Sequence, residues 1–347
     1  MLNTVLSQRC LRFSRTNLLI KLIVGYSLVA QLRRGVNISG ADFGEQNLPG
    51  ALGRDYTFNT QDTYKYFADR GLNLFRIGVK WERLQPALGG PLDAGYLDGL
   101  RRNLDWADHV RAVAVVNLQN FARYRLNGFE YIVDNSPALT RHHLADLWVR
   151  VSTEIRDHPA LHALGLMNEP HDLGQADWKE ISQTVLGALR ESGDRSLLSI
   201  AGDNWSHADQ WPDLGESSWI DDPFHNFVYE AHLYFDADRS GKYAISYDDE
   251  LRRNKRLPLV GVDRLRPFTD WLARNQERGY LGEYGVPGGD PRWLDVLETF
   301  LQALDAASLD GTYWSAGEWW GTYPLSVQPD PASQTEKPQL AVLARHV

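Results

Sequence analysis

Two glutamates in this sequence each lie at the end of a short apolar run that is typical of a buried β-strand. Glu169 ends the run LHALGLMNE (161–169) beside Asn168, and Glu283 lies in the run GYLGEYG (279–285). Pro170 follows Glu169, and because proline cannot donate to a sheet ladder, the strand must end there. A carboxylate placed beside an amide at a strand end is a candidate chemical group that needs a partner elsewhere in the chain.

The elements that must position these carboxylates form an alternating pattern. Apolar runs recur at 35–39, 72–79, 112–119, 161–169, 197–203, 227–234, 279–285 and 311–317. Most are too apolar to have a solvated face, as expected for parallel strands covered by helices. Helical patterns occur between most of them, at 60–71, 140–158, 176–193, 266–279 and 291–308.

Eight strand candidates alternating with helices predict an α/β protein, a single (β/α)8 TIM barrel. The alternative is an open doubly wound sheet. It is disfavoured because the segment after the first strand, GADFGEQNLPG (40–50), lacks the spacing of a glycine-rich phosphate loop.

A barrel of this kind collects its functional residues at the C-terminal ends of its strands. Glu169 ends the fourth predicted strand and Glu283 lies near the end of the seventh, so we expect both at one rim. Paired carboxylates suit cleavage of a glycosidic bond: one donates a proton to the leaving oxygen, and the other attacks the sugar carbon or activates water. Asn168 would then hold a sugar hydroxyl. For either glutamate alone, a salt bridge at the rim would be the alternative interpretation.

Several motifs resemble glycoside hydrolase family 5, and in particular its fungal and bacterial cellulase branch: FRIGVKWERLQP, LMNEPHD, EAHLYFDAD, LGEYGVP and YWSAGEWWG. The similarity extends from about Arg34 to Pro329. The resemblance implies a retaining, endo-acting hydrolase of a β-linked glucan, with a cellulose-like or exopolysaccharide backbone. It implies Glu169 as the acid/base and Glu283 as the nucleophile.

The same resemblance implies roles for residues around the pair. Arg76 would support the nucleophile and keep it ionised, because a nearby opposite charge favours the carboxylate. His232 and Tyr234 would lie between the two glutamates, and Trp314 would form the aromatic floor under the sugar, with barrel packing as its alternative role. The further substrate-binding candidates at the strand ends and the rim are Gln119, Asn120, Asn168, Trp205 and Trp319.

One motif departs from the family pattern. Family members usually read Asp-x-His-Asn at the third strand end, whereas Asn117 and Gln119 stand at the first and third positions here. Glutamine keeps hydrogen-bonding capacity but carries no positive charge. Three interpretations remain open: tolerated drift, a changed sugar preference or pH profile, and weakened activity. The alternative functions are a transglycosylase or a non-hydrolytic glucan-binding protein on the same fold, or a mannanase or β-1,3-glucanase.

Composition limits the partners. The 347 residues carry a formal net charge of −9, which argues against a nucleic-acid partner. The 12 Trp and 15 Tyr residues would suit stacking on sugars. Cys10 is the single cysteine, which excludes an intramolecular disulfide and a cysteine-based metal site, and no cluster has metal-ligand spacing. We therefore expect no metal or other cofactor, a β-glucan or related polysaccharide as partner, and a monomer.

Residues 1–33 are predicted to be an N-terminal extension, and residues 34–347 the catalytic domain. Arg9, Arg12 and Arg15 precede an apolar run at 17–32, an order that resembles a signal peptide, although Lys21 interrupts the run. The extension is therefore either a signal or anchor, or an extra helix. We expect a secreted or periplasmic protein, with a cytoplasmic one as the alternative, and membrane contact only if 17–32 act as an anchor.

Overall fold

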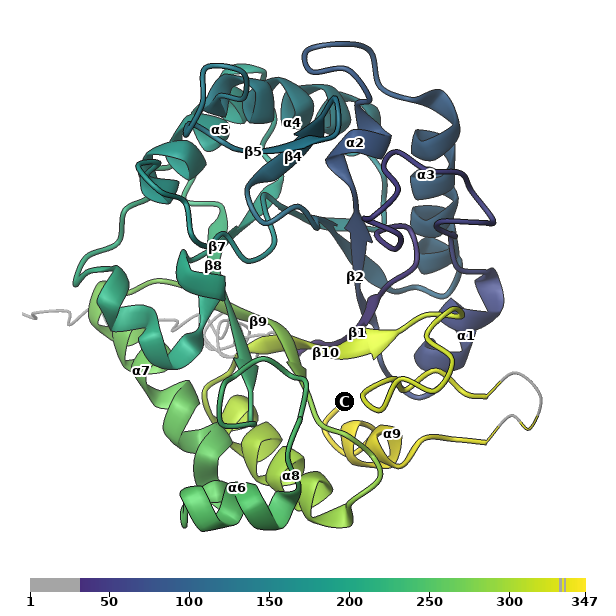
Figure 1. The fold of residues 1–347 in the computed structure, drawn as a ribbon, viewed down its shortest axis with the longest axis vertical. Helices are drawn as coiled ribbons and strands as arrows, with labels where there is room; N and C mark the ends of the chain where they lie inside the picture. The colour runs from purple at the N-terminus through teal and green to yellow at the C-terminus, as the bar shows by residue number, and fades with distance from the viewer. Residues whose placement is uncertain (1–31, 331–332, 334) are drawn as a thin grey trace, which may run out of the picture. The chain divides into compact units, whose positions relative to one another are not determined.

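The computed structural model describes residues 32–330, 333 and 335–347, so nearly all of the predicted N-terminal extension lies outside the described residues. A closed barrel of parallel strands forms the centre of the fold, as predicted (Figure 1). Around the barrel the strand order is β1-β10-β9-β8-β7-β6-β3-β2. The strands are β1 Arg34–Ile38, β2 Leu74–Val79, β3 Val113–Leu118, β6 Leu161–Gly165, β7 Leu197–Ala201, β8 Phe227–Tyr234, β9 Gly279–Gly285 and β10 Asp310–Ala316.

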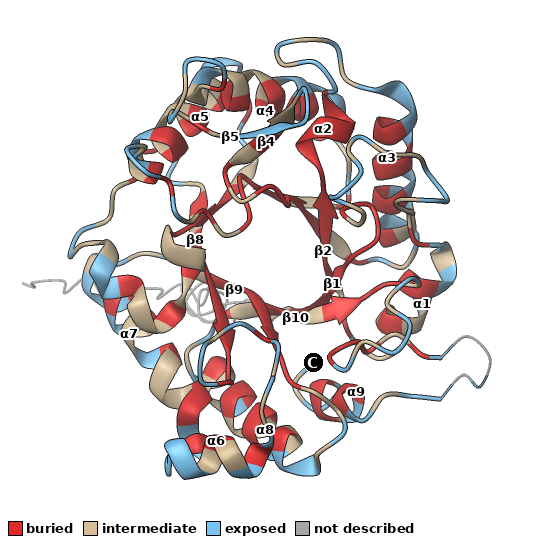
Figure 2. Cartoon of the chain, viewed as in Figure 1, coloured by how far each residue is buried: buried red, intermediate tan, exposed pale blue. Residues whose placement is uncertain are grey.

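Helices surround the barrel and turn their apolar faces toward it, so that buried positions concentrate on the strands and on the inner helix faces (Figure 2). This double cover explains why the strand sequences are apolar on both faces. The helices are α1 Gln61–Ala68, α2 Trp81–Leu84, α3 Ala94–His109, α4 Arg141–Ile155, α5 Trp178–Glu191, α6 Tyr247–Arg253, α7 Val260–Asn275, α8 Pro291–Ala306 and α9 Pro338–Leu343. In the described part of the chain, none of them combines the length and apolarity needed to cross a membrane.

Some local features differ from the sequence prediction. Helix α3 was not predicted, although Asp93 caps it and its apolar residues recur at helical spacing. The hairpin β4 Arg123–Leu126 and β5 Phe129–Ile132 was not predicted either. Helix α7 begins at Val260 and contains Pro267, whereas the sequence predicted a start at 266. Buried Val260 and Leu265 anchor the first turns of α7 in spite of the proline.

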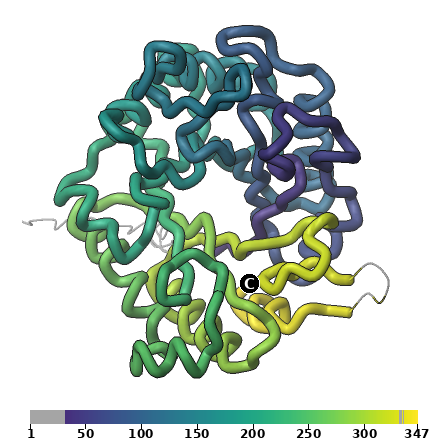
Figure 3. Tube along the Cα trace, in the orientation of Figure 1, coloured from purple at the N-terminus to yellow at the C-terminus, as the bar shows by residue number. Residues whose placement is uncertain are grey.

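Strand pairing places the functional side chains next to one another. The barrel closes where β1, near the start of the described chain, pairs with β10, near its end (Figure 3). Asn37 on β1 pairs with Arg76 on β2. An irregularity after Ala231 shifts the register of β8 against β9, so that His232 pairs with Glu283. The register therefore brings side chains from four strands to one site.

Candidate active site

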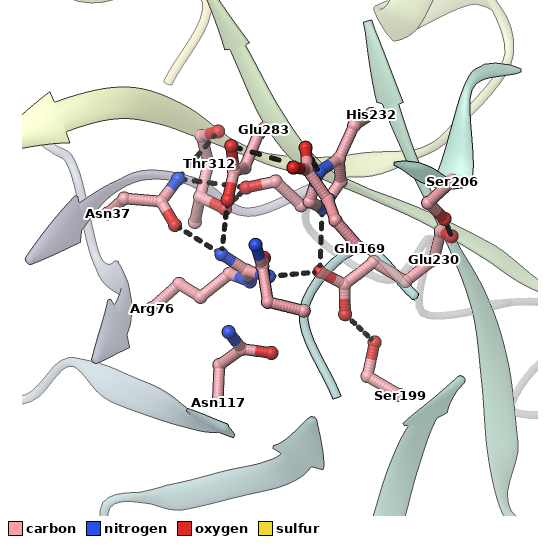
Figure 4. A network of polar contacts seen from close by, with 12 residues as sticks. Asn37, Arg76, Asn117, Glu169, Ser199, Ser206, Glu230, His232, Glu283 and Thr312 are labelled. Atoms are coloured by element: carbon pink, nitrogen blue, oxygen red, sulfur yellow. Dashed lines mark hydrogen bonds and ion pairs between the residues drawn. The ribbon is translucent and has the colours of Figure 1, made fainter. Parts of the chain in front are cut away.

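The two predicted glutamates meet at one end of the barrel. A carboxylate oxygen of Glu169, one of Glu283 and a ring nitrogen of His232 all lie within 4.8 Å of one another (Figure 4). The carboxyl groups of a retaining pair are about 5–5.5 Å apart, and those of an inverting pair about 6.5–9.5 Å. This close approach favours a retaining pair over an inverting one.

Glu169 lies beyond the end of its strand rather than in it. Strand β6 ends at Gly165, four residues earlier than the predicted run. Glu169 has a left-handed φ of 41°, an unfavourable conformation for a residue with a Cβ. The backbone N–H of Asn168 donates to the Leu118 carbonyl at 2.7 Å, and the Trp205 N–H donates to the Pro170 carbonyl at 3.1 Å. These bonds to neighbouring segments hold the strained turn that presents the carboxylate.

Arg76 contacts several side chains of the site through its guanidinium group. Its guanidinium is buried and donates through Nη1 to Glu283 Oε1 at 2.9 Å and to Asn37 Oδ1 at 2.8 Å. Its Nη2 donates to Asn168 Oδ1 at 2.7 Å and forms an ion pair with Glu230 Oε1, also at 2.7 Å. Arg76 therefore orients both Glu283 and the amide that precedes Glu169.

His232 lies between the two glutamates, and Tyr234 contacts Glu283. The Nδ1 atom of His232 is 2.7 Å from Glu169 Oε1 and 3.7 Å from Glu283 Oε2. The Tyr234 hydroxyl donates to Glu283 Oε2 at 2.8 Å. Glu283 is therefore held by Arg76 on one oxygen and by Tyr234 on the other.

Burial and neighbouring charges shift the pKa values of Glu283 and His232 in opposite directions. Burial raises the pKa of Glu283, and repulsion from Glu169 adds to the rise, while His232 and Arg76 oppose it. Arg76 thus acts in the predicted direction, but burial outweighs it. Burial would lower the pKa of His232, but Glu283, Glu169 and Glu230 outweigh that effect and raise it to about 9. The raised pKa favours the imidazolium form of His232, which carries a proton on each ring nitrogen.

A cavity of about 460 Å³ opens above the glutamates. Of the predicted substrate-binding residues, those that line it with Glu169 and Glu283 are Gln119, Asn168, Trp205, Tyr234 and Trp314. The ring of Trp205 stacks on His171, with centroids 4.4 Å apart and planes 12° apart. Trp314 contacts Trp320 edge-on at 5.8 Å. The cavity thus has two aromatic surfaces, one following β7 and one on β10.

Gln119 faces the cavity with a defined orientation. Asn117 Nδ2 donates to Gln119 Oε1 at 2.7 Å, and Lys80 Nζ donates to the Gln119 backbone carbonyl at 2.6 Å. Because its side-chain carbonyl already accepts from Asn117, Gln119 has its NH₂ group left to offer a ligand as a donor. The two amides that stand in place of the family's usual Asp and His, Asn117 and Gln119, are therefore hydrogen-bonded to each other.

Asn120 and Trp319, which the sequence predicted to bind substrate, lie outside this cavity. The Asn120 side chain accepts from the Trp81 N–H and donates to Glu82 Oε2, both at 2.8 Å. The chain bends after β3, and these bonds direct the Asn120 amide toward α2, which it holds in place. Trp319 is 42% exposed on the surface and does not line the cavity.

The sequence prediction also missed residues that belong to the site. Phe121, His207 and Tyr323 line the cavity, together with the loop 238–242. Glu230 lies beneath the site and contacts both Arg76 and His232. A signal for Glu230 was present: in EAHLY it precedes His232 by two residues, and the period of a strand puts both on one face.

The geometry favours acid–base chemistry over metal binding. Among the residues that the structure describes, Glu169, His232 and Glu283 are the group that brings three potential ligand atoms together. Both ring nitrogens of His232 are engaged by carboxylates, Nδ1 by Glu169 and Nε2 by Glu230. The Arg76 guanidinium also contacts Glu283 and would repel a cation there.

Comparison with known proteins identifies the family. Residues 36–319 match the model of the family Cellulase (glycosyl hydrolase family 5), and the chain belongs to this family of retaining glycoside hydrolases. Endo-beta-1,4-glucanase B of Emericella nidulans is 30% identical over 325 residues, which cover 90% of this chain and 93% of the relative.

Solved structures agree with this assignment. Endoglucanase Cel5A of Pseudomonas stutzeri in complex with cellobiose is 34% identical, with a TM-score of 0.83, and the match covers 90% of this chain and 92% of that one. XacCel5A in complex with cellopentaose is 33% identical, with a TM-score of 0.82, over 91% of this chain and 100% of the other. The predicted barrel and the predicted family are both confirmed.

Proposed function

We propose that this chain is a retaining endo-β-1,4-glucanase in which Glu283 is the nucleophile and Glu169 the acid/base. The observation that carries the proposal is the close approach of the two carboxylates around His232 at the floor of the cavity. The relative from Emericella nidulans bears the name endo-beta-1,4-glucanase, and the Pseudomonas and Xac structures contain β-1,4-linked oligosaccharides of glucose.

In the first step, ionised Glu283 attacks the anomeric carbon and Glu169 gives its proton to the leaving glycosidic oxygen. Arg76 and Tyr234 orient the two oxygens of Glu283 for this attack. In the second step, Glu169 takes a proton from water, which attacks the glycosyl-enzyme and releases a product with the original anomeric configuration. Asn168, Gln119 and the aromatic rings of Trp205 and Trp314 would bind the sugars on either side of the bond.

All of these side chains come from one chain, which supports a monomer as the active unit. The proposed substrate is a polymer too large to enter a cell, which supports action in the periplasm or outside the cell. A role of residues 1–33 in export belongs to the same proposal, with residues 34–347 as the catalytic domain.

Hydrolysis of cellopentaose, followed by chromatography and by proton NMR of the nascent anomers, tests the proposal. We expect shorter cello-oligosaccharides whose new reducing ends are first β. Products longer than cellopentaose would indicate a transglycosylase, and binding without cleavage would indicate a glucan-binding protein. Parallel reactions with mannopentaose and laminaripentaose test the mannanase and β-1,3-glucanase alternatives. First release of the α-anomer would refute the retaining roles of Glu169 and Glu283.

A further inference from the structure

Glu230 is a third carboxylate of the site, and it faces neither the cavity nor solvent. It lies on β8 and is fully buried. Its Oε1 pairs with Arg76 Nη2 at 2.7 Å and with His232 Nε2 at 3.1 Å, and its Oε2 accepts from the Ser199 hydroxyl at 2.5 Å (Figure 4). Both carboxylate oxygens of Glu230 are therefore engaged by protein groups, and neither is free for substrate.

The strand next to Glu230 leaves room for its carboxylate. Gly282 lies on the neighbouring strand β9, and a Cβ at that position would lie 2.1 Å from Glu230 Oε1. No real Cβ approaches an oxygen so closely, so any side chain at 282 would displace the carboxylate. The absence of a side chain at 282 therefore leaves the space in which Glu230 reaches Arg76 and His232.

The charges of the site balance only when Glu230 is ionised. Arg76 and His232 are buried cations, and Glu283 is an anion when it is ready to attack. Glu169 must be protonated and neutral before it can act as an acid. Glu230 supplies the second negative charge, without which the site would hold an unpaired buried cation, a costly state. Burial would raise the pKa of Glu230, but Arg76 and His232 outweigh it and hold the value at about 2.

We infer that Glu230 is a positioning residue that keeps His232 an imidazolium, so that His232 Nδ1–H donates to Oε1 of Glu169 and the catalytic proton is carried on Oε2. Glu230 holds the ring through Nε2 and fixes Arg76 at the same time, and it does not touch substrate. The inference rests on the proposed function for the role of Glu169. The titratable and charged groups that face Glu230 and His232 from the surrounding elements are Arg76, Glu169, His207, Tyr280 and Glu283.

The variant Glu230→Gln tests the inference, because it keeps the shape of the side chain and removes its charge. At acid pH His232 is protonated in both proteins, so Glu283 loses only a nearby negative charge and ionises at lower pH. At alkaline pH, the His232 proton is lost earlier, because the carboxylate that helps to raise the pKa of His232 is gone. Both limbs of the profile of kcat/KM against pH should therefore move down by about one pH unit. The KM for cellopentaose should stay within about twofold, since Glu230 makes no substrate contact.

Ser199→Ala is the matched control, because it removes a neutral partner of Glu230 and leaves the charge in place. Its two limbs should coincide with those of the natural enzyme. A lower kcat for Glu230→Gln with both limbs unmoved would show a merely structural role and overturn the inference. Limbs that move equally in Ser199→Ala and Glu230→Gln would also overturn it, because charge would not be the cause.

A measurement on the natural protein does not depend on the folding of any variant. In ¹⁵N–¹H spectra of histidine-labelled protein, His232 should show the shifts of an imidazolium, with both nitrogens protonated, at pH 7. A neutral ring at pH 7 would overturn the inference whether or not the protein cleaves glucan. An imidazolium in a protein without glucanase activity would support the role of Glu230 in holding the charge and count against the proposed function alone.

Discussion

Replacement of Tyr234 by phenylalanine would remove one hydroxyl from the site and leave the ring in place. That hydroxyl donates to Glu283 Oε2 at 2.8 Å, and both side chains are buried. The bond stabilises the ionised form of Glu283, so it lowers the pKa of a carboxyl group that burial raises. Loss of the hydroxyl should therefore raise the pKa of Glu283 further.

The size of the effect follows from the type of bond. A hydrogen bond to a charged group contributes about 1.5–3 kcal/mol, and 1 pKa unit corresponds to about 1.4 kcal/mol. The pKa of Glu283 should therefore rise by about 1–2 units. Tyr234 lines the cavity, so water can replace part of the lost bond and bring the shift toward the lower value.

The assay is the profile of kcat/KM against pH on a soluble cello-oligosaccharide. Because the acid limb reports ionisation of the nucleophile, we expect this limb to move upward in Tyr234→Phe. Tyr284→Phe is the matched control: Tyr284 follows Glu283 directly, and its buried hydroxyl has no hydrogen-bond partner among the residues that the structure describes. The control should leave the profile unchanged. An unmoved acid limb in a folded Tyr234→Phe protein would refute the assignment of Glu283 as the ionised nucleophile.

Further predictions concern the two glutamates and Gln119. Glu169→Gln and Glu283→Gln should each abolish most turnover of unactivated glucan; on an aryl cellobioside, whose leaving group needs no acid, Glu169→Gln should still release a burst of phenol and Glu283→Gln should not. Equal losses on both substrates would contradict the separate roles. Gln119→His introduces a group with an unperturbed pKa of about 6.5, whose cationic form favours ionised Glu283 and should move the acid limb downward. Superimposable profiles and equal rates would show that glutamine at position 119 is a tolerated substitution without functional effect.

Much of the fold was readable in the sequence, because the barrel imposes a strong pattern. Each parallel strand is covered by helices outside and by packed side chains inside, so its sequence is apolar on both faces. The predicted runs therefore coincide with the barrel strands to within a few residues. Helix α3 and the β4–β5 hairpin were missed because short or mixed patterns are compatible with several local structures until tertiary contacts select one.

The sequence by itself determined which glutamates to consider, since each stands at the end of an apolar run. Which other residues share their site was decided by tertiary structure. Asn120 was expected beside Gln119 in the site, but the chain turns its amide toward α2. Glu230 was not selected, because a carboxylate inside a strand is unfavourable until Arg76 and His232, from separate positions in the barrel, compensate its charge. Such compensation depends on strand register, which sequence periodicity along one strand does not encode.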